Sequence, residues 1–543
     1  MNAPISPEGL ESLDTSAILL SPDLDRSEAF GLLKPFGFRN VAQADSNLQL
    51  MAGDPHSRKL LAKILNELLL AVGQTADPDQ ALNDWDRYLK IGVNRTQLFS
   101  YLENAPRMLH LLCTIFGNSP AMTQTLIRDP MLIYWMGDDR VVNQPPSRRA
   151  LWHTLQESLR AVKTYEVMLH ALRRFHRREL LRIGVQDLLR VTQVSETVAT
   201  ISDLACVVVQ SAYEIVNARL ARQFGTPMHR DRSGKMVKTG FVVIGMGKFG
   251  GWELNYSSDV DLIYVYASSD GKTQSARRET SVSNEVYFET LARDLTRELG
   301  AATPEGILYR VDLRLRPDGS VGPITSSLND AVQYYQTRGQ DWERLAFLKA
   351  KPVAGSMKLG RSFLDRLRSF VGGKGEQSNA RVLEMVRYLK RKIQAKMIRR
   401  GEMNRNVKLG TGGIRDIEFL VQTFQLLNGW KYPSLLEQNT LIVLDRLGQE
   451  KIIPSSTAKE LSRAYVFLRD VEHKLQMVHE LQTHVLPVED EELAKCAVRL
   501  GYPKSSMESN AATFLRDYRK VTSYVQKEFE DQFSRLEKSS PQG

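Results

Sequence analysis

The sequence predicts an α+β fold, a mostly helical chain with a central mixed sheet flanked by helical regions. Long stretches toward both ends carry apolar residues at helical spacing, with few glycines or prolines inside them. Between these stretches, short β-branched apolar runs alternate with glycine-rich turns, as in a mixed sheet. A chain of 543 residues is also too long for one compact core. We therefore predict four parts in order: a helical region over 1–225, an α/β domain over 226–372, a helical bundle over 373–535 and a tail over 536–543.

The composition is that of an ordinary soluble globular protein, with 42% hydrophobic and 25% charged residues. No run of about 18 apolar residues is present, and the N-terminus lacks the pattern of a signal peptide, so we expect a cytoplasmic chain without membrane contact. The three cysteines are far apart and odd in number, which fits a reducing compartment. The net charge of +10 is modest for this length and gives no reason to expect a nucleic-acid partner.

The first region contains two clear amphipathic patterns. Ser57 to Val72 carries apolar residues such as Leu61 and Leu65 at helical spacing, and the segment 165–189 repeats the pattern. We predict a helix over each of them. The segment 225–235 that follows is polar, contains glycine and proline, and has no periodicity, which indicates a linker before the central domain.

A glycine-rich turn lies between two predicted strands. Phe241 to Ile244 is apolar and β-branched, and Gly245-Met-Gly-Lys-Phe-Gly-Gly251 follows it directly. The apolar run from Leu262 to Tyr266 predicts the second strand, and Asp259 and Asp261 stand at its entrance. Because side chains i and i+2 of a strand point to the same face, we expect both carboxylates to face one spot beside the turn.

A third carboxylate is expected from a later strand. The run Leu308-Tyr-Arg-Val-Asp-Leu-Arg-Leu-Arg316 has strand character, and the turn Pro317-Asp-Gly319 ends it. Asp312 lies inside this run between apolar neighbours, so we predict that it joins the other two acids. Arg314 and Arg316 share its face of the strand. They either neutralise phosphate groups or pair with Asp312 across the strands.

Helical patterns resume in the last part of the chain. The segment 380–400 is long, basic and amphipathic, and its cations fit a solvent-exposed helix face. A glycine-rich break, Lys408-Leu-Gly-Thr-Gly-Gly413, precedes a further helical pattern that begins at Ile414.

The residues around the turn suit metal-dependent nucleotidyl transfer. Mg²⁺ prefers oxygen ligands and binds through one or two carboxylates together with substrate phosphate. One or two ions held by Asp259, Asp261 and Asp312 can activate the attacking oxygen and stabilise the leaving oxygen. Backbone N–H groups of the turn can hold phosphate oxygens. The candidate nucleotide- or phosphate-binding residues are Gly247, Lys248, Gly250, Ser258, Arg314 and Arg316.

The same turn also matches a dinucleotide-binding fingerprint. Gly245, Gly247 and Gly250 follow a strand in the required spacing, and Asp270 lies where a ribose-binding acid would be expected. The spacing after the turn argues against this reading, because only some nine residues separate Gly250 from the next strand, which is short for a crossover helix. The fingerprint also gives no reason for the acids at the strand entrance.

Four ordered motifs carry a resemblance to a known family. The turn with its two acids resembles the signature of the glutamine synthetase adenylyltransferase/adenylyl-removing enzymes, which belong to the DNA polymerase β-like nucleotidyltransferases. Three further stretches agree with it at suitable separations. They are Tyr309-Arg-Val-Asp-Leu-Arg-Leu-Arg-Pro-Asp-Gly319, Gln340-Asp-Trp-Glu-Arg344 with Lys349 and Lys351, and Val407-Lys-Leu-Gly-Thr-Gly-Gly-Ile-Arg-Asp-Ile-Glu-Phe419.

The resemblance implies an activity and a set of partners. Full-length members carry two catalytic halves, one that removes AMP from a tyrosine of glutamine synthetase by phosphorolysis, giving ADP, and one that adds AMP from ATP. This sequence contains a single half, and its motifs resemble the N-terminal, removing half, so removal of AMP is favoured while addition from ATP stays open. The chain is either a single-headed relative or one half of a two-headed enzyme. The implied partners are glutamine synthetase, ATP or ADP and phosphate, and a PII-type nitrogen signalling protein, and the implied cofactor is Mg²⁺.

Two other hypotheses remain open from the sequence. The chain could be a catalytically silent regulatory or scaffold module that binds glutamine synthetase, although the intact acids Asp259, Asp261 and Asp312 argue against this. It could also be an NAD-binding oxidoreductase if the glycine turn is a true dinucleotide fingerprint.

Overall fold

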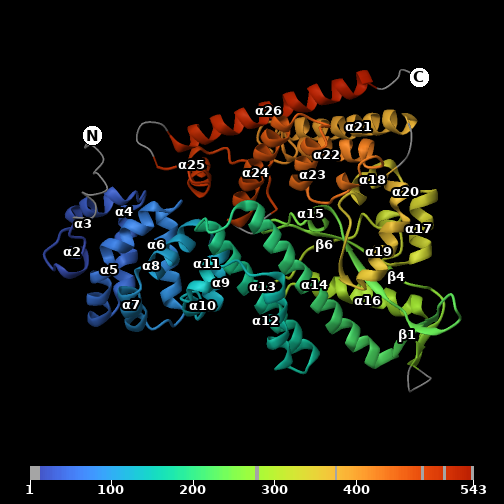
Figure 1. Ribbon diagram of the computed structural model, residues 1–543. Coiled ribbons are helices and arrows are strands. Elements are labelled where there is room, and N and C mark those ends of the chain that lie inside the picture. The colour runs from blue at the N-terminus through green and yellow to red at the C-terminus, as the bar shows by residue number, and fades with distance from the viewer. Residues whose placement is uncertain (1–12, 275–279, 373–375, 479–481, 505–508, 540–543) are drawn as a thin grey trace. The chain divides into compact units, whose positions relative to one another are not determined.

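A computed structural model describes residues 13–274, 280–372, 376–478, 482–504 and 509–539 (Figure 1). By its internal contacts the chain divides into two compact units, each assembled from segments that are distant in sequence. The first unit comprises Met1–Pro145, Leu180–Gln193 and Asp470–Arg519, and the second comprises Pro146–Glu179, Val194–Arg469 and Lys520–Gly543. The sequential boundaries expected from the sequence stay predictions.

The described part of the first unit is helical. Helix α5 illustrates how the sequence begins these helices: the Asp54 carboxylate accepts hydrogen bonds from the backbone N–H groups of His56 and Ser57, and Pro55 occupies the first helical position. The helix predicted over 57–72 is thereby confirmed. The bounds are α2 Ala17–Leu20, α3 Arg26–Leu33, η1 Lys34–Phe36, α4 Val41–Ala52, α5 Pro55–Gln74, α6 Pro78–Lys90, α7 Arg95–Asn104, α8 Pro106–Asn118, α9 Pro120–Arg128, α10 Leu132–Trp135, α11 Asp139–Asn143 and α25 Asp490–Arg499.

Three long helices contribute residues to both units, and the second unit has further helices of its own. The shared helices are α13 Tyr165–Leu188, which confirms the second predicted helix, α24 Ser455–Met477 and α26 Asn510–Ser539. The helices of the second unit are α12 Arg148–Arg160, α14 Val194–Phe224, α15 Gly247–Gly250, α16 Asn284–Gly300, η3 Gly319–Val321, α17 Leu328–Thr337, α18 Asp341–Phe347, α19 Met357–Arg366, α20 Arg368–Val371, α21 Glu376–Arg400, α22 Ile414–Asn428, η4 Pro433–Leu435 and α23 Thr440–Gln449.

The second unit contains two small sheets. A mixed sheet has the order β6-β4-β3-β8, with β7 also paired to β4, and an antiparallel sheet has the order β2-β1-β5. In the mixed sheet β4 runs antiparallel to β3 and parallel to β6 and β7. The strands are β1 Thr226–Arg230, β2 Met236–Lys238, β3 Phe241–Gly245, β4 Val260–Tyr266, β5 Lys272–Gln274, β6 Val311–Asp312, β7 Ser326–Ser327 and β8 Lys351–Gly355. The mostly helical α+β fold is as predicted.

Both faces of the mixed sheet are covered by helices. Val242 and Ile244 point into an apolar cluster that includes Phe347 and Phe363 from the α18 and α19 side. Phe241, one residue out of phase, stacks on rings of α14 and α16 at centroid distances of 5.6 and 5.7 Å. This period of two buries every residue of β3 and explains its unbroken apolar run.

Helix α14 is the core helix of the second unit. Among the described residues it is the one helix long and apolar enough to cross a membrane by composition, and 67% of its most apolar window is buried. Its polar side chains bond within the unit: Gln210 accepts a hydrogen bond from the Gly355 N–H at 2.7 Å, and Asp203 accepts one from the Trp252 indole at 2.9 Å. These contacts identify α14 as a buried protein helix.

Two predictions about local structure are wrong. The strand expected over 308–316 pairs only at Val311–Asp312, because the Arg314 backbone N–H donates to the Asp312 carboxylate at 2.8 Å and turns the chain away from the sheet. The segment 225–235 is not a linker, since β1 lies inside it and pairs with β2 and β5.

The dinucleotide-binding hypothesis is also wrong. A dinucleotide-binding unit needs two parallel strands joined by a crossover helix. Here β3 and β4 are antiparallel, and the only helix between them, α15, has 4 residues.

We predict that Gly250→Ala destabilises the second unit. A methyl group there would overlap the carbonyl oxygen of Lys349 and would lie 2.5 Å from that of Gly245. Overpacking against backbone atoms should lower the free energy of unfolding by about 2–4 kcal/mol in urea titrations. Gly300→Ala serves as control, because the nearest atom lies 3.9 Å from its added methyl group. Equal unfolding free energies for the two variants would contradict the close approach at Gly250.

Candidate active site

The glycine turn and the entrance of β4 face each other directly. The Met246 N–H donates to the Asp261 carbonyl at 2.9 Å, which places the turn beside the second acid. Gly247 has a φ of +54°, and a methyl group at this position would lie 2.7 Å from the Asp261 Oδ2 atom. A glycine is therefore required both by the backbone conformation and by the close approach of the carboxylate.

The third predicted acid joins the other two through strand register. Asp312 is the register partner of Asp261 in the parallel pair of β6 and β4. The Val260 N–H donates to the Arg310 carbonyl at 2.9 Å and fixes this pairing. Asp261 and Asp312 thus lie side by side in the sheet, and the Asp312 and Asp259 carboxylates are both near enough to raise the pKa of Asp261.

Arginines pair with two of the three acids. The Arg310 Nε donates to Asp259 Oδ1 at 2.7 Å, and the same guanidinium donates to the Ser257 carbonyl at 2.7 Å. The Arg314 Nε donates to Asp312 Oδ2 at 2.9 Å. Of the two alternatives for Arg314, the structure therefore contains the pairing with Asp312.

The other predicted phosphate-binding residues differ in their surroundings. Arg316 donates to backbone carbonyls of its own loop, including that of Pro323 at 3.0 Å, so it stabilises this loop. The Ser258 hydroxyl accepts a hydrogen bond from the Asn255 N–H at 3.0 Å. The Gly250 N–H donates to the Met246 carbonyl within the turn at 3.1 Å, so it is already used.

The charges around Asp261 oppose one another. Burial raises the pKa of Asp261 to about 6, the Asp312 and Asp259 carboxylates raise it too, and Lys408 and Arg314 lower it. The pKa of Asp312 is lowered, chiefly by its hydrogen bonds from Arg314. The site thus combines three carboxylates with several cations, and Lys408 reaches it from the segment between α21 and α22.

The carboxylates fit a divalent cation in chemistry but not in their present pairing. Among the residues that the structure describes, no group of three or more His, Cys, Asp or Glu side chains is placed to hold a metal ion. Asp259 and Asp312 are instead paired with Arg310 and Arg314. Burial is the main cause of the raised pKa of Asp261, and repulsion from Asp312 and Asp259 adds to it. A bound cation would relieve that repulsion, and oxygen donors suit Mg²⁺.

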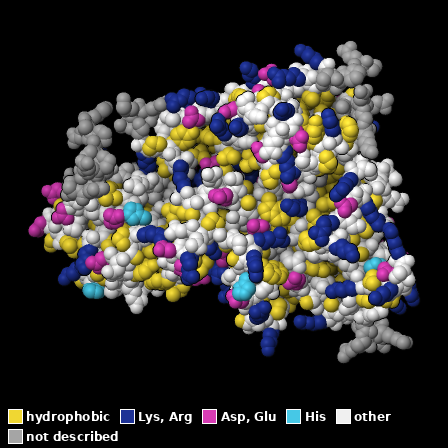
Figure 2. Space-filling model, in the orientation of Figure 1, with side chains coloured by type: hydrophobic (Ala, Val, Ile, Leu, Met, Phe, Trp, Pro, Cys, Tyr) yellow, Lys and Arg dark blue, Asp and Glu magenta, His cyan; other side chains and the backbone are white. Residues whose placement is uncertain are grey.

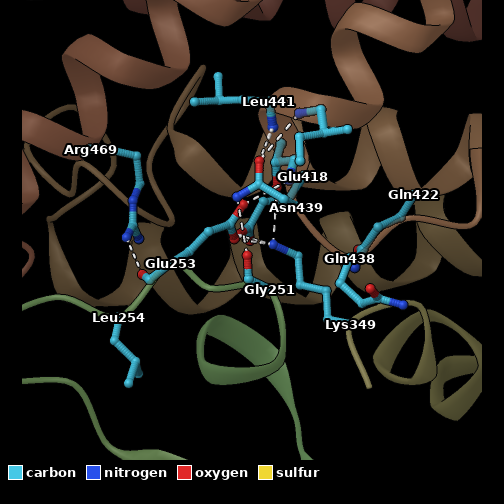
Figure 3. A network of polar contacts seen from close by, with 12 residues as sticks. Gly251, Glu253, Leu254, Lys349, Glu418, Gln422, Gln438, Asn439, Leu441 and Arg469 are labelled. Carbon is cyan, nitrogen blue, oxygen red and sulfur yellow. Dashed lines mark hydrogen bonds and ion pairs between the residues drawn. The ribbon is translucent and has the colours of Figure 1, made fainter. Parts of the chain in front are cut away.

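A buried ionic network lies directly behind the glycine turn (Figure 3). Lys349 follows α18, and its ammonium group bonds the Glu253 carboxylate and the Thr440 hydroxyl, the latter at 3.0 Å. It also lies 3.7 Å from the Glu418 carboxylate. Lys349, Glu253 and Glu418 are 7%, 2% and 5% exposed. One buried lysine therefore joins the turn segment to α22 and α23.

The same network holds the chain between the glycine turn and the acids. Arg469 of α24 donates to the Glu253 carbonyl and, at 2.8 Å, to the Asn255 side-chain oxygen. The Asn439 amide donates to the Gly251 carbonyl at 3.1 Å, and the Thr440 N–H donates to the Glu253 carboxylate at 2.8 Å. Residues 251–255 are thus held by the start of α23 and by α24.

Glu418 stays ionised although it is buried. Burial alone would raise its pKa, but Arg415, Lys349, Lys408 and Lys248 together hold the pKa of Glu418 at about 2. Lys248 belongs to the glycine turn and Lys408 to the segment before α22. Cations from both sides of the site therefore surround one buried carboxylate.

Comparison with known proteins agrees with this geometry. Residues 109–366 match the family model of glutamate-ammonia ligase adenylyltransferase, and residues 387–533 match that of GlnD PII-uridylyltransferase. The chain is 38% identical over 396 residues to the bifunctional glutamine synthetase adenylyltransferase/adenylyl-removing enzyme of Nitrosococcus oceani, which covers 73% of this chain and 40% of that protein.

The chain belongs to the glutamine synthetase adenylyltransferase/adenylyl-removing family. It is also 38% identical over 384 residues to the similarly named enzyme of Pseudomonas aeruginosa, covering 71% of this chain and 38% of that protein. For the enzyme of Rhizobium meliloti the identity is 40% over 343 residues, covering 63% of this chain and 34% of that protein. The chain therefore spans about two fifths of the first two relatives, and it corresponds to one half of this bifunctional family.

The family motifs acquire structural roles that the sequence did not reveal. The Asp-Trp-Glu-Arg344 motif forms α18, where Glu343 is buried and accepts a hydrogen bond from the Gln340 N–H in a capping box. Glu418, which belongs to the Val407–Phe419 motif, and Lys349 meet in the buried network. Neither was predicted as a site residue. The available signal was the presence of an acid and a lysine in otherwise apolar helical surroundings.

We predict that Asp261→Asn stabilises this family member at neutral pH when EDTA is present. The pKa of Asp261 is about 6 in the folded chain, against an ordinary value of about 3.9 in an unfolded chain. Between these two pH values the folded chain binds more protons than the unfolded chain, so stability falls as the pH rises. Above pH 6 the ionised Asp261 therefore lowers the free energy of unfolding. The free energy of unfolding of the variant should exceed that of the wild type by about 2 kcal/mol at pH 7.5 and should equal it at about pH 4. Asp312→Asn should have the opposite sign at pH 7.5, because the pKa of Asp312 is lowered. A gain at both pH values would contradict the assignment.

We predict a large loss of stability for Lys349→Met. The variant removes the cation from Glu253 and weakens the charge balance at Glu418, and breaking a buried ion pair on one side costs about 3–5 kcal/mol. Urea unfolding should show this loss. Lys351→Met is the matched control, because Lys351 lies only over the Trp252 ring at 4.1 Å and should cost about 1 kcal/mol or less. Similar losses for both lysines would refute a special role for Lys349.

Proposed function

We propose that this chain transfers AMP at a tyrosine of glutamine synthetase, with Asp259, Asp261 and Asp312 as the reacting centre. The register of Asp261 with Asp312 beside Gly247 supports this most strongly, because it brings three sequence-distant elements of a nucleotidyltransferase to one edge of the sheet. The names of the related enzymes support glutamine synthetase as the protein substrate.

The acids would hold the cofactor and the cations would hold phosphate. Asp259, Asp261 and Asp312 would bind one or two Mg²⁺ ions, whose charge polarises the phosphate group when they are bound. When substrate enters, Arg310 and Arg314 would exchange their carboxylate partners for phosphate oxygens, since a guanidinium binds both groups in the same bidentate manner.

The glycine turn would receive the same phosphate groups from the other side. Gly247 leaves room beside Asp261 for close approach of the substrate, and Lys248 adds a positive charge at the turn. Lys408 adds a further positive charge beside Asp261. Lys248 and Ser258 would contribute to phosphate binding, whereas Arg316 donates to carbonyls of its own loop.

We propose removal of AMP as the main direction. In this direction an oxygen of inorganic phosphate forms a bond to the α-phosphorus, the bond from phosphorus to the tyrosine oxygen breaks, and ADP leaves. The tyrosine oxygen then takes up a proton. The resemblance of the motifs that end at Arg344 and Glu418 to the removing half supports this choice. Addition from ATP, with release of pyrophosphate, is the second candidate because the relatives are named for both activities.

We also propose a cytoplasmic location and contact with a PII-type signalling protein. The match of residues 387–533 to the PII-uridylyltransferase model supports a link to that protein. The burial of α14 supports a chain without a membrane span.

Two parallel reactions test the proposal. The chain is incubated with adenylylated glutamine synthetase, Mg²⁺ and phosphate, and separately with unmodified glutamine synthetase, Mg²⁺ and ATP. We expect ADP release in the first reaction. Asp261→Asn should lower its rate by at least about a thousandfold, since the Mg²⁺ ions that would polarise the reacting phosphate lose a carboxylate ligand. EDTA should have the same effect.

Asp318→Asn is the matched control for this experiment. Asp318 is an acid in the turn that ends the Tyr309–Gly319 motif, pairs with Arg338 and lies outside the proposed centre. It should retain its rate within about twofold. An unchanged rate in Asp261→Asn would overturn the centre, incorporation of AMP only in the second reaction would reverse the direction, and no product in either would favour the silent-scaffold hypothesis.

A further inference from the structure

Helix α21 separates its cations into two groups. On the side that faces α22 and α26, Lys390 lies 3.3 Å from Asp416 and 3.6 Å from Glu530, and Arg387 pairs with Glu537. The apolar residues of this side, including Val386 and Met397, are fully buried. These cations therefore serve the packing of the helix.

The cations of the opposite side have no such partners. The exposed residues between 388 and 400 include five cations, and no carboxylate of the described chain forms an ion pair with any of them. They are Arg391, Lys392, Lys396, Arg399 and Arg400. Cations one turn away on the same helix do pair with carboxylates. The lack of acidic partners therefore belongs to this side of α21 and not to the whole helix.

Two large apolar side chains lie within the same exposed side. Tyr388 is 57% exposed and Ile398 is 66% exposed. We call the surface formed by these two residues and the five cations the α21 face. Figure 1 draws α21 beneath α26, and Figure 2 shows Lys and Arg side chains spread over the viewed surface. Tyrosine and arginine are enriched among residues that dominate protein interfaces, whereas lone surface lysines are not.

A reaction on a surface tyrosine of a folded protein needs such a second contact. One side chain inserted at the acids buries far less than the roughly 800 Å² per partner of a stable protein interface. Recognition must therefore come from a surface outside the reacting centre. Charge complementarity then requires an acidic patch on the partner.

We propose that the α21 face docks an acidic surface of the protein substrate, glutamine synthetase, and so presents its tyrosine for AMP transfer. The proposal rests on the proposed function for the identity of the partner. A nucleic acid is disfavoured as the occupant, because the face contains a single aromatic ring and no series of rings on which bases could stack.

Binding is measured without chemistry, in EDTA and without phosphate or nucleotide. The affinity of the chain for glutamine synthetase is determined at low and high salt for the wild type and for the double variant Arg391→Glu, Lys392→Glu. We expect the variant to bind about tenfold more weakly at low salt and to lose most of the salt dependence, because exposed charges act through screened attraction. Circular dichroism and urea unfolding verify that the variant is folded.

The matched control reverses two exposed cations on another helix of the same unit. Lys358 and Arg361 of α19 have no ion pair with any described carboxylate, so Lys358→Glu, Arg361→Glu changes the net charge equally. This control should bind within about twofold of the wild type. In steady-state assays, the α21 variant should raise the KM for adenylylated glutamine synthetase about tenfold, with kcat and the KM for phosphate unchanged.

The outcomes separate this proposal from the proposed function. One outcome is a chain that transfers no AMP and yet binds glutamine synthetase more tightly than the α21 variant does. That result would support the α21 face as a docking surface and would contradict the proposed AMP transfer. Transfer with unchanged affinity in the α21 variant would overturn the docking surface and leave the chemistry intact. The docking proposal would also be overturned if the α21 variant lost binding to a PII-type protein, to single-stranded DNA or to anionic lipid vesicles but bound glutamine synthetase as tightly as the wild type.

Discussion

The position of Lys349 is the constraint on which the candidate site depends. Its carbonyl oxygen occupies the space that a side chain at Gly250 would need, and its ammonium group is shared by Glu253 and Glu418. A buried lysine is tolerated only when its charge is compensated. The two glutamates supply this compensation, and in doing so they fix the segment after the glycine turn against α22 and α23. The turn is therefore held in place by helices that follow it by well over a hundred residues.

This arrangement explains how a short and glycine-rich segment can serve as a precise site. Glycines allow close approach to Asp261 but give the backbone little rigidity of its own. Rigidity comes instead from Arg469, Asn439 and the Glu253 network, which bind the backbone and side chains of residues 251–255. The pKa of Asp261 is raised chiefly by burial and further by the Asp312 and Asp259 carboxylates, so the acids lie close together in spite of their like charge. Carboxylate oxygens held close together are the ligands that Mg²⁺ prefers.

Strand periodicity made the acids predictable, whereas the network was not. The apolar run before the glycine turn and the alternation of Asp259 and Asp261 indicated both strands and their common face. Asp312 was also found, although its strand has only two paired residues, because Arg314 caps the acid and bends the chain. Lys349 and Glu253 are 96 residues apart, and no local pattern relates them. The strand ends at Asp312, so the two-residue alternation does not extend to Arg316, which donates to carbonyls of its own loop, and its phosphate-binding role stays a prediction.

The central claim is that Asp259, Asp261 and Asp312 form one metal-binding centre. Titration of the chain with Mn²⁺ in the presence of phosphate, followed by the electron paramagnetic resonance signal of the free ion, tests it most directly. The account predicts that the wild type binds one or two ions and that Asp261→Asn and Asp312→Asn each lose this binding, while Asp318→Asn keeps it. Equal numbers and affinities of bound ions in the wild type and in Asp261→Asn would contradict it.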